Sequence, residues 1–143
     1  KQILRTAGVA NIDEYNRNAE KKLYRIVFAC DEIAEVLDKT GLSKQQKDEI
    51  LKIESELSII ARQGRAFGIH LVLATQRPDA AILNGQIRNN IDTRICGRAD
   101  NVLSQIILDN TDASDKIAKS SQGRFLTNSG KIFQAYWFDE NIL

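Results

Sequence analysis

A continuous apolar run that ends in two adjacent acids is the feature that most constrains the fold of this chain. Residues 26–30 read Ile-Val-Phe-Ala-Cys, and Asp31 and Glu32 follow directly. An uninterrupted apolar run of this length is typical of a strand buried in a parallel sheet. Open α/β sheets bind ligands at the carboxyl ends of their strands. The run therefore predicts a buried strand with both carboxylates at such an edge.

The two acids have two interpretations. In the first, the run is a Walker B element of a P-loop ATPase, in which Asp31 holds Mg²⁺ on the nucleotide and Glu32 orients or deprotonates water. In the second, the acids are only the first turn of a helix, where negative charge is favourable. The run alone does not decide between them, because the same pattern is common in α/β proteins.

A second apolar strand, predicted at residues 69–74, ends in Thr75 and Gln76. With its flanks, this segment reads Gly-Ile-His-Leu-Val-Leu-Ala-Thr-Gln-Arg-Pro at residues 68–78. Here the sequence resembles the FtsK/SpoIIIE family of DNA translocases and the related ATPases of conjugative elements. Residues 8–16 and 90–95 resemble the stretches that precede the family's Walker B and follow this loop. The resemblance extends from residue 4 to about residue 138.

The resemblance implies a P-loop NTPase (RecA-like) α/β fold, a parallel sheet flanked by helices that is incomplete here and followed by a C-terminal β-hairpin. It also implies an ATP-dependent motor that moves double-stranded DNA as a hexameric ring, in chromosome segregation or conjugative transfer. No G-x-x-x-x-G-K-[ST] motif occurs in the 143 residues, and without that loop a triphosphate has no backbone cradle. We therefore expect residues 1–143 to be the C-terminal part of a motor domain, inactive alone.

Two other functions stay open. One is the ATPase of a related protein-secretion system, whose motor has similar parts. The other is a non-catalytic module that only packs against partners. The net charge of +1 gives no bulk signature of nucleic-acid binding. No apolar run approaches the length of a membrane span, so we expect a cytoplasmic chain that reaches the inner face of the membrane only through its parent protein.

The favoured interpretation gives a role to each polar residue at the two strand ends. Asp31 would be the ligand of Mg²⁺ and Glu32 the catalytic base. Thr75 would contribute to nucleotide binding, and Gln76 would sense the γ-phosphate of ATP or position water. The alternative for Gln76 is an amide that only hydrogen-bonds a loop.

Basic residues supply the remaining candidates. Arg65 and Arg94 are candidates for the arginine finger that acts on a neighbouring subunit's nucleotide; the resemblance does not choose between them, and surface arginines are the common outcome. Contacts to DNA phosphates would come from four further residues: Arg77, Lys39, Lys44 and Lys47. An equally good explanation is that the three lysines are solvent-exposed charges at a helix end.

Periodicity and capping signals place the remaining elements. We expect helices at 11–22, 32–37, 43–63 and 100–108, a turn of helix near residue 86 and another within 111–121, a third strand at 93–96 and a hairpin at 123–126 and 131–138. In the family's sheet, the phosphate-loop strand lies between the strand ending near Gln76 and the strand beginning near Arg94. These two strands should therefore pair directly, or another copy should fill the gap. Cys30 and Cys96 should stay reduced and unbridged.

Overall fold

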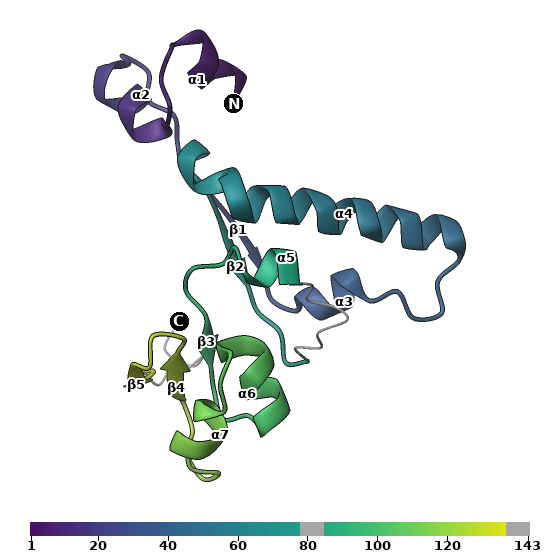
Figure 1. The fold of residues 1–143 in the computed structure, drawn as a ribbon. Coiled ribbons are helices and arrows are strands. Elements are labelled where there is room, and N and C mark those ends of the chain that lie inside the picture. Colours follow the sequence, from purple (N-terminus) through teal and green to yellow (C-terminus); the bar gives the residue numbers. More distant parts are fainter. Residues whose placement is uncertain (78–84, 137–143) are drawn as a thin grey trace, which may run out of the picture. The chain divides into compact units, whose positions relative to one another are not determined.

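The computed structural model describes residues 1–77 and 85–136 (Figure 1). The chain divides into two compact units, one made of residues 1–77 and 82–91 and the other of residues 78–81 and 92–143. Each unit is an α/β arrangement with its own sheet and its own hydrophobic core. No helix within the described ranges has the length and apolar character needed to cross a membrane.

The first unit is a parallel strand pair with helices. Its elements are α1 (Gln2–Thr6), α2 (Ile12–Asn18), β1 (Ile26–Cys30), α3 (Ile33–Leu37), α4 (Lys44–Gln63), the 3-10 turn η1 (Gly64–Phe67), β2 (Ile69–Leu73) and α5 (Gly85–Arg88). Strands β1 and β2 pair in parallel from Ile26 opposite Ile69 to Cys30 opposite Leu73. The chain between them forms α3 and α4, which is the crossover that a parallel pair requires.

Local signals set the helix boundaries of this unit. Helix α4 begins with the predicted capping box, in which the Ser43 hydroxyl and the Gln46 side chain each accept a backbone N–H. Helix α2 begins at the predicted cap but ends at Asn18, four residues before the expected end. The Asn16 side chain accepts from the Leu23 N–H at 2.8 Å and donates to the Leu23 carbonyl at 2.9 Å. These two bonds turn the chain back toward α2 and stop the helix.

The prediction that β1 is buried is wrong for most of the strand. Val27 is 64% exposed and Phe28 48% exposed. The core of this unit contains Ile33, Leu37, Leu57 and Ile87, and the sheet residues packed against it are Cys30, Leu71 and Leu73. The described helices therefore cover the sheet near the carboxyl ends of its strands and leave most of β1 open. An apolar run specifies a strand, but burial requires a layer on each face.

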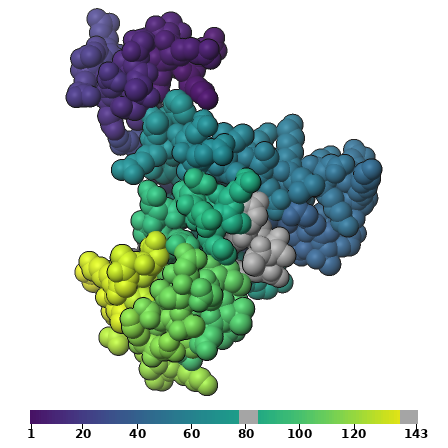
Figure 2. All heavy atoms as spheres, in the orientation of Figure 1, coloured from purple at the N-terminus to yellow at the C-terminus, as the bar shows by residue number. Residues whose placement is uncertain are grey.

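Helix α4 carries apolar side chains outside the core as well as within it. Leu51, Ile53 and Ile59 are exposed, and the atoms of this helix form a blue-green part of the surface in Figure 2. Its inward side holds Leu57 together with two polar residues, Glu54 and Ser58, all of them buried. The buried side of this helix therefore carries a charged residue, Glu54, which is rare without a partner of opposite charge.

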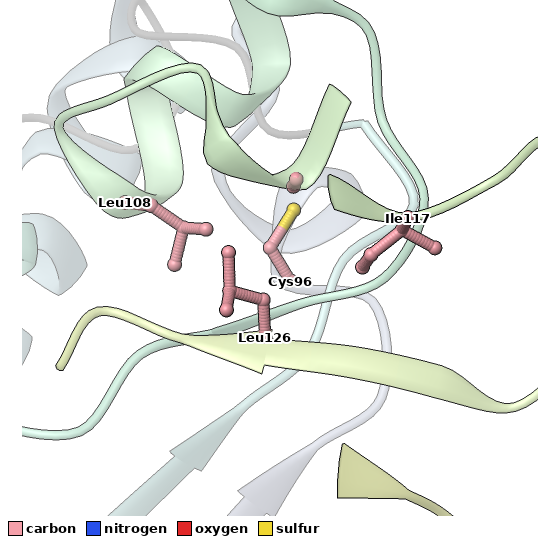
Figure 3. Packing of buried hydrophobic residues seen from close by; sticks show 5 residues of the cluster. Cys96, Leu108, Ile117 and Leu126 are labelled. Carbon is pink, nitrogen blue, oxygen red and sulfur yellow. The ribbon is translucent and has the colours of Figure 1, made fainter. Parts of the chain in front are cut away.

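The second unit is a small antiparallel sheet with two helices. It contains β3 (Ile95–Cys96), α6 (Asn101–Leu108), α7 (Asp112–Lys116), β4 (Arg124–Thr127) and β5 (Ile132–Gln134), with the strands in the order β3-β4-β5. Its core is a cluster of apolar side chains from both helices and the sheet: Cys96, Leu108, Ala113, Ile117 and Leu126 (Figure 3).

The predicted hairpin is confirmed as β4 and β5, although β5 is shorter than expected. Trp137 and Phe138, which the hairpin was expected to include, lie outside the described residues. The third strand forms, but it is antiparallel to β4, with Cys96 opposite Leu126. It does not continue the parallel sheet. Of the two expected outcomes for β2 and β3, direct pairing does not occur, and filling of the gap by another copy stays a prediction. Strand β3 has only two residues, and its backbone hydrogen bonds are made with strand β4 of the hairpin.

Candidate active site

The carboxyl ends of β1 and β2 are held together beyond the strands themselves. The Ala74 N–H donates to the Cys30 carbonyl at 2.8 Å, and the Ile33 N–H donates to the Ala74 carbonyl at 2.9 Å. These bonds place the turn at Asp31 and Glu32 directly beside the loop that follows β2. The polar residues that end the two strands, Asp31, Glu32, Thr75 and Gln76, therefore lie at one edge of the strand pair.

Glu32 forms the hydrogen bonds that connect the turn after β1 to the loop after β2. One of its carboxylate oxygens, Oε2, accepts the Gln76 backbone N–H at 2.8 Å, and Oε1 accepts the Ala34 N–H at 3.3 Å. A hydrogen bond from the Thr75 hydroxyl, followed in importance by that from the Gln76 N–H, lowers the pKa of Glu32. The carboxylate is therefore ionised. It is oriented by one backbone N–H from the loop after β2 and by one from the start of α3.

Asp31 differs from its neighbour. Its side chain is exposed, and no group of three or more His, Cys, Asp or Glu residues that could hold a metal occurs among the described residues. A single open carboxylate fits Mg²⁺ bound with a nucleotide, because this ion usually keeps waters and takes one or two carboxylates plus substrate phosphates. It does not fit a metal site made by protein alone.

Two successive residues of the loop after β2, Gln76 and Arg77, contact the turn and helix that follow β1. The Thr75 Oγ1 accepts the Arg77 backbone N–H at 3.0 Å. The guanidinium of Arg77 forms an ion pair with Glu35 of α3, and both side chains are about two-thirds exposed. Gln76 uses its backbone N–H for Glu32 and presents its side chain at the surface. The Glu32 carboxylate is thus bound by the backbone of Gln76, while the Gln76 side chain is exposed.

The three predicted DNA-contacting lysines fall into two groups. Lys39 donates to Glu54 at 2.6 Å, and this ion pair is largely buried, with the two side chains 27% and 9% exposed. Its charge is therefore used inside the unit. Lys44 and Lys47 lie exposed in the first turns of α4, where a positive charge opposes the helix dipole and gains nothing for stability.

The two candidate arginines also differ in environment. Arg65 lies in η1 and is exposed. Arg94 is only 17% exposed, and its Nη2 pairs with Asp109 Oδ2 at 2.5 Å. Its Nε and Nη1 are buried and have no hydrogen-bond partner among the described atoms. The two arginines therefore differ in exposure: the side chain of Arg94 is mostly buried, and Arg65 is exposed.

Three contacts of this region were not predicted from the sequence: Thr75 with Glu32, Arg77 with Glu35 and Lys39 with Glu54. The first follows from the parallel pairing of the strands, which brings their carboxyl ends together. The third had a signal, because Glu54 stands four residues after Ile50 and three before Leu57 on the apolar side of α4. A charge at such a position predicts a partner. The exposed pair of Arg77 and Glu35 has no comparable signal.

The first unit also contains an open pocket of about 670 Å³ between α4 and α5. Its lining is mostly polar and includes Glu54, Ser58, Gln86 and Asn89. None of the predicted site residues lines it. The candidate site is therefore the exposed edge at Glu32 and Gln76 rather than this pocket.

Comparison with known proteins gives a consistent family. No family model matches the chain. A protein called DNA translocase FtsK from Chlorobaculum tepidum is 33% identical over 133 residues, which are 92% of this chain and 15% of that protein. Among solved structures, the pCW3 conjugation coupling protein TcpA, in a monomer form with ATPγS, is 42% identical with a TM-score of 0.88; the match covers 99% of this chain and 41% of that one.

A more distant neighbour shares the fold. The cytoplasmic domain of the type VII secretion ATPase EccC from Thermomonospora curvata is 22% identical with a TM-score of 0.73, over 98% of this chain and 16% of that one. These neighbours confirm the expected P-loop ATPase fold class, with a small parallel sheet and an antiparallel hairpin. The chain spans about 15% of the length of the first curated relatives it matches.

Proposed function

This chain belongs to the FtsK/SpoIIIE family of DNA translocases, and on that premise we propose that residues 1–143 form the C-terminal part of a motor domain. The parent protein would use ATP to move double-stranded DNA. The observation that carries the proposal is the convergence of Glu32 with Thr75 and Gln76 at the carboxyl ends of two paired parallel strands. This is the edge at which α/β sheets bind their ligands.

The residues at this edge would have different roles in ATP hydrolysis. Asp31, the open carboxylate, would join the coordination shell of Mg²⁺ on ATP. Glu32, ionised and fixed, would accept a proton from water, and the exposed Gln76 amide would orient that water or contact the terminal phosphate. Bound Mg-ATP supplies the phosphoryl group and the charge that these residues act on. Because no phosphate-loop motif occurs in the 143 residues, its cradle would come from another part of the parent protein.

Assembly into a hexameric ring would complete the site. The side chain of an arginine finger has to extend from the surface of its own subunit to the nucleotide bound by a neighbour. Arg65 suits this role better than Arg94, because Arg65 is exposed while the side chain of Arg94 is only 17% exposed. We therefore assign the trans-acting role to Arg65.

Contacts to DNA would come from the exposed basic residues. Lys44 and Lys47 place charge at the start of α4, where it does not serve helix stability. Arg77 lies on the loop after β2, and its exposed pair with Glu35 would be exchanged for a phosphate at little cost. Lys39 is left out of this set because it neutralises the buried Glu54. Such contacts bind DNA without reading its sequence.

A conjugative role is favoured over a chromosomal one. The support is the likeness to a conjugation coupling protein over nearly the whole chain at 42% identity, compared with 33% for the curated FtsK relative. The parent protein would then act in the cytoplasm at the inner face of the cell membrane. The likeness to secretion ATPases is at 22% identity and bears on the fold alone.

The catalytic assignment is tested with the complete parent protein. Glu32→Gln should abolish phosphate release from Mg-ATP while nucleotide binding persists, because only the base is lost. Glu56→Gln, an exposed glutamate of α4, is the matched control and should keep normal turnover. Normal turnover in Glu32→Gln would reject Glu32 as the base.

A further inference from the structure

We infer that Glu35 competes with DNA phosphate for the guanidinium of Arg77, so that DNA binding removes a contact between α3 and the loop after β2. The inference rests on the proposed function, since it takes Arg77 to contact DNA and Gln76 to act on the nucleotide. It assigns a role to Glu35, which the motifs of the sequence do not single out. It also connects the DNA-contacting surface to the candidate active site.

Two acidic residues lie three positions apart at the start of α3. Glu32 is the residue that caps this helix, and Glu35 belongs to its first turn. The Glu35 backbone N–H donates to the Glu32 carbonyl at 3.2 Å. Residues at this spacing are neighbours on the surface of a helix, so both carboxylates can contact a single loop.

Consecutive residues of the loop after β2 use these two acids. The Gln76 backbone N–H donates to Glu32 Oε2 at 2.8 Å, and the Arg77 guanidinium donates to Glu35. The Arg77 backbone N–H also donates to Thr75 Oγ1 at 3.0 Å. The ion pair with Glu35 is therefore a side-chain restraint on the loop, one residue after Gln76.

The pair of Arg77 and Glu35 is open to a competing anion. The two side chains are 68% and 64% exposed, so a phosphate can reach the guanidinium without opening a core. Exposed ion pairs add little to stability, whereas a guanidinium can bind phosphate through two parallel hydrogen bonds. The Glu35 carboxylate would return to water after the exchange and would leave no buried charge.

The pair of Lys39 and Glu54 shows the contrast within the same unit. Its side chains are only 27% and 9% exposed. Removing Lys39 from that pair would leave an uncompensated charge inside the unit, which is strongly unfavourable. Of these two ion pairs, only the one made by Arg77 is therefore suited to exchange with DNA.

Exchange at Arg77 would change the restraint on Gln76. Once the guanidinium binds DNA, the side-chain contact next to Gln76 is lost, while its backbone bond to Glu32 can remain. The proposed function has Gln76 act on water or on the terminal phosphate, so its freedom to move bears on hydrolysis. Coupling between two contacts is reciprocal, and loss of the Glu35 contact should therefore strengthen DNA binding.

A double-mutant cycle in the complete parent protein tests the competition. Binding to a short fluorescein-labelled DNA duplex is measured by anisotropy with ATPγS, at one fixed salt concentration. Glu35→Gln should lower Kd by about two- to fivefold, because it removes the competitor. Arg77→Gln should raise Kd, and adding Glu35→Gln to it should change Kd by less than about 1.5-fold.

Asp38→Asn is the matched control for the change in charge. It removes one negative charge at the other end of α3, where the Asp38 carboxylate accepts the Thr40 N–H at 2.8 Å. It should change Kd by less than about 1.5-fold, because Asp38 forms no ion pair with Arg77 in the described structure.

ATP turnover without DNA is the second measurement. Glu35→Gln should shift this turnover in the direction in which DNA shifts that of the unsubstituted protein, because both remove the same contact. Asp38→Asn should leave it unchanged. Unchanged DNA-free turnover in Glu35→Gln would mean that the exchange does not affect Gln76 and would overturn the inference.

The binding results can also overturn it. A similar fall in Kd in Glu35→Gln and Asp38→Asn, or an equal effect of Glu35→Gln with and without Arg77, would indicate only a general loss of negative charge. An unchanged Kd in Arg77→Gln would mean that Arg77 does not contact DNA. An unsubstituted protein that does not bind the duplex rejects the proposed function as well. Binding weakened by Arg77→Gln but unaffected by Glu35→Gln rejects only the role of Glu35.

Discussion

Glu32 and Gln76 are 44 positions apart in the chain, and the backbone N–H of Gln76 donates to the Glu32 carboxylate at 2.8 Å. This bond joins the turn after β1 to the loop after β2. It uses the backbone of Gln76, whose side chain is exposed. The turn that carries Glu32 and the loop that carries Gln76 are thereby kept adjacent by the parallel pairing of their strands.

Arg65 should act across a subunit boundary. Mixing Arg65→Ala subunits into rings of the unsubstituted parent protein should lower ATP turnover by more than the mutant fraction, because each altered subunit impairs its neighbour's site. Turnover is measured as phosphate release over a series of mixing ratios. Arg62→Ala, which removes an exposed arginine from the last turn of α4, is the control. A loss strictly proportional to the Arg65→Ala fraction would argue against action in trans.

Lys39 should matter for stability rather than for DNA. Lys39→Ala leaves Glu54 buried without its partner, so the free energy of unfolding should fall, toward the lower end of the about 3–5 kcal/mol typical of a broken buried pair. Urea denaturation of the chain measures this. Lys44→Ala, at an exposed position of α4, should stay within about 0.5 kcal/mol. An equal effect of the two substitutions would mean that the Lys39–Glu54 pair does not form.

Gly68 should tolerate no side chain. Its φ of +74° disfavours other residues, and a Cβ there would lie 2.5 Å from Ile12 Cδ1, on a side chain that is fully buried. Gly41 has a similar φ of +71° but open space around it. Gly68→Ala should therefore lower the melting temperature more than Gly41→Ala, since both share the backbone strain and only the first adds a clash. Equal shifts would show that Ile12 does not pack there.

The two cysteines should remain thiols with limited reactivity. Both are free in the structure, and burial raises the pKa of Cys96 above its usual range. Because the thiolate is the reactive form, Cys96 should react with iodoacetamide at neutral pH only after unfolding. Mass analysis of the labelled chain, native and in urea, counts the modified thiols. Rapid labelling of Cys96 in the native chain, or a mass two units low without reductant, would contradict this.

Local signals in the sequence specified the elements that depend on near neighbours. The Ser43–Gln46 capping box marks the start of α4, and the apolar runs before Glu32 and Thr75 form β1 and β2. Parallel neighbours end at the same edge of a sheet, so their polar ends lie together once the strands pair. This part of the candidate site was therefore predictable from chain order and sheet geometry.

Features that depend on distant partners were not predictable in the same way. An apolar sequence cannot tell whether a layer covers Val27, and that residue is exposed. The sequence of β3 does not distinguish a parallel neighbour from the hairpin strand that it pairs with. The pair of Arg77 with Glu35 depends on the side-chain conformations of two exposed residues, which nothing in the sequence fixes.

The proposed function requires that the parent protein moves double-stranded DNA by ATP hydrolysis that depends on Glu32. Displacement of a third DNA strand from a triplex by the complete protein tests it most directly. With Mg-ATP the unsubstituted protein should displace the strand, and Glu32→Gln should not, although it still binds ATPγS. Displacement that continues in Glu32→Gln, or ATP hydrolysis by the unsubstituted protein without any displacement, would contradict the proposed function.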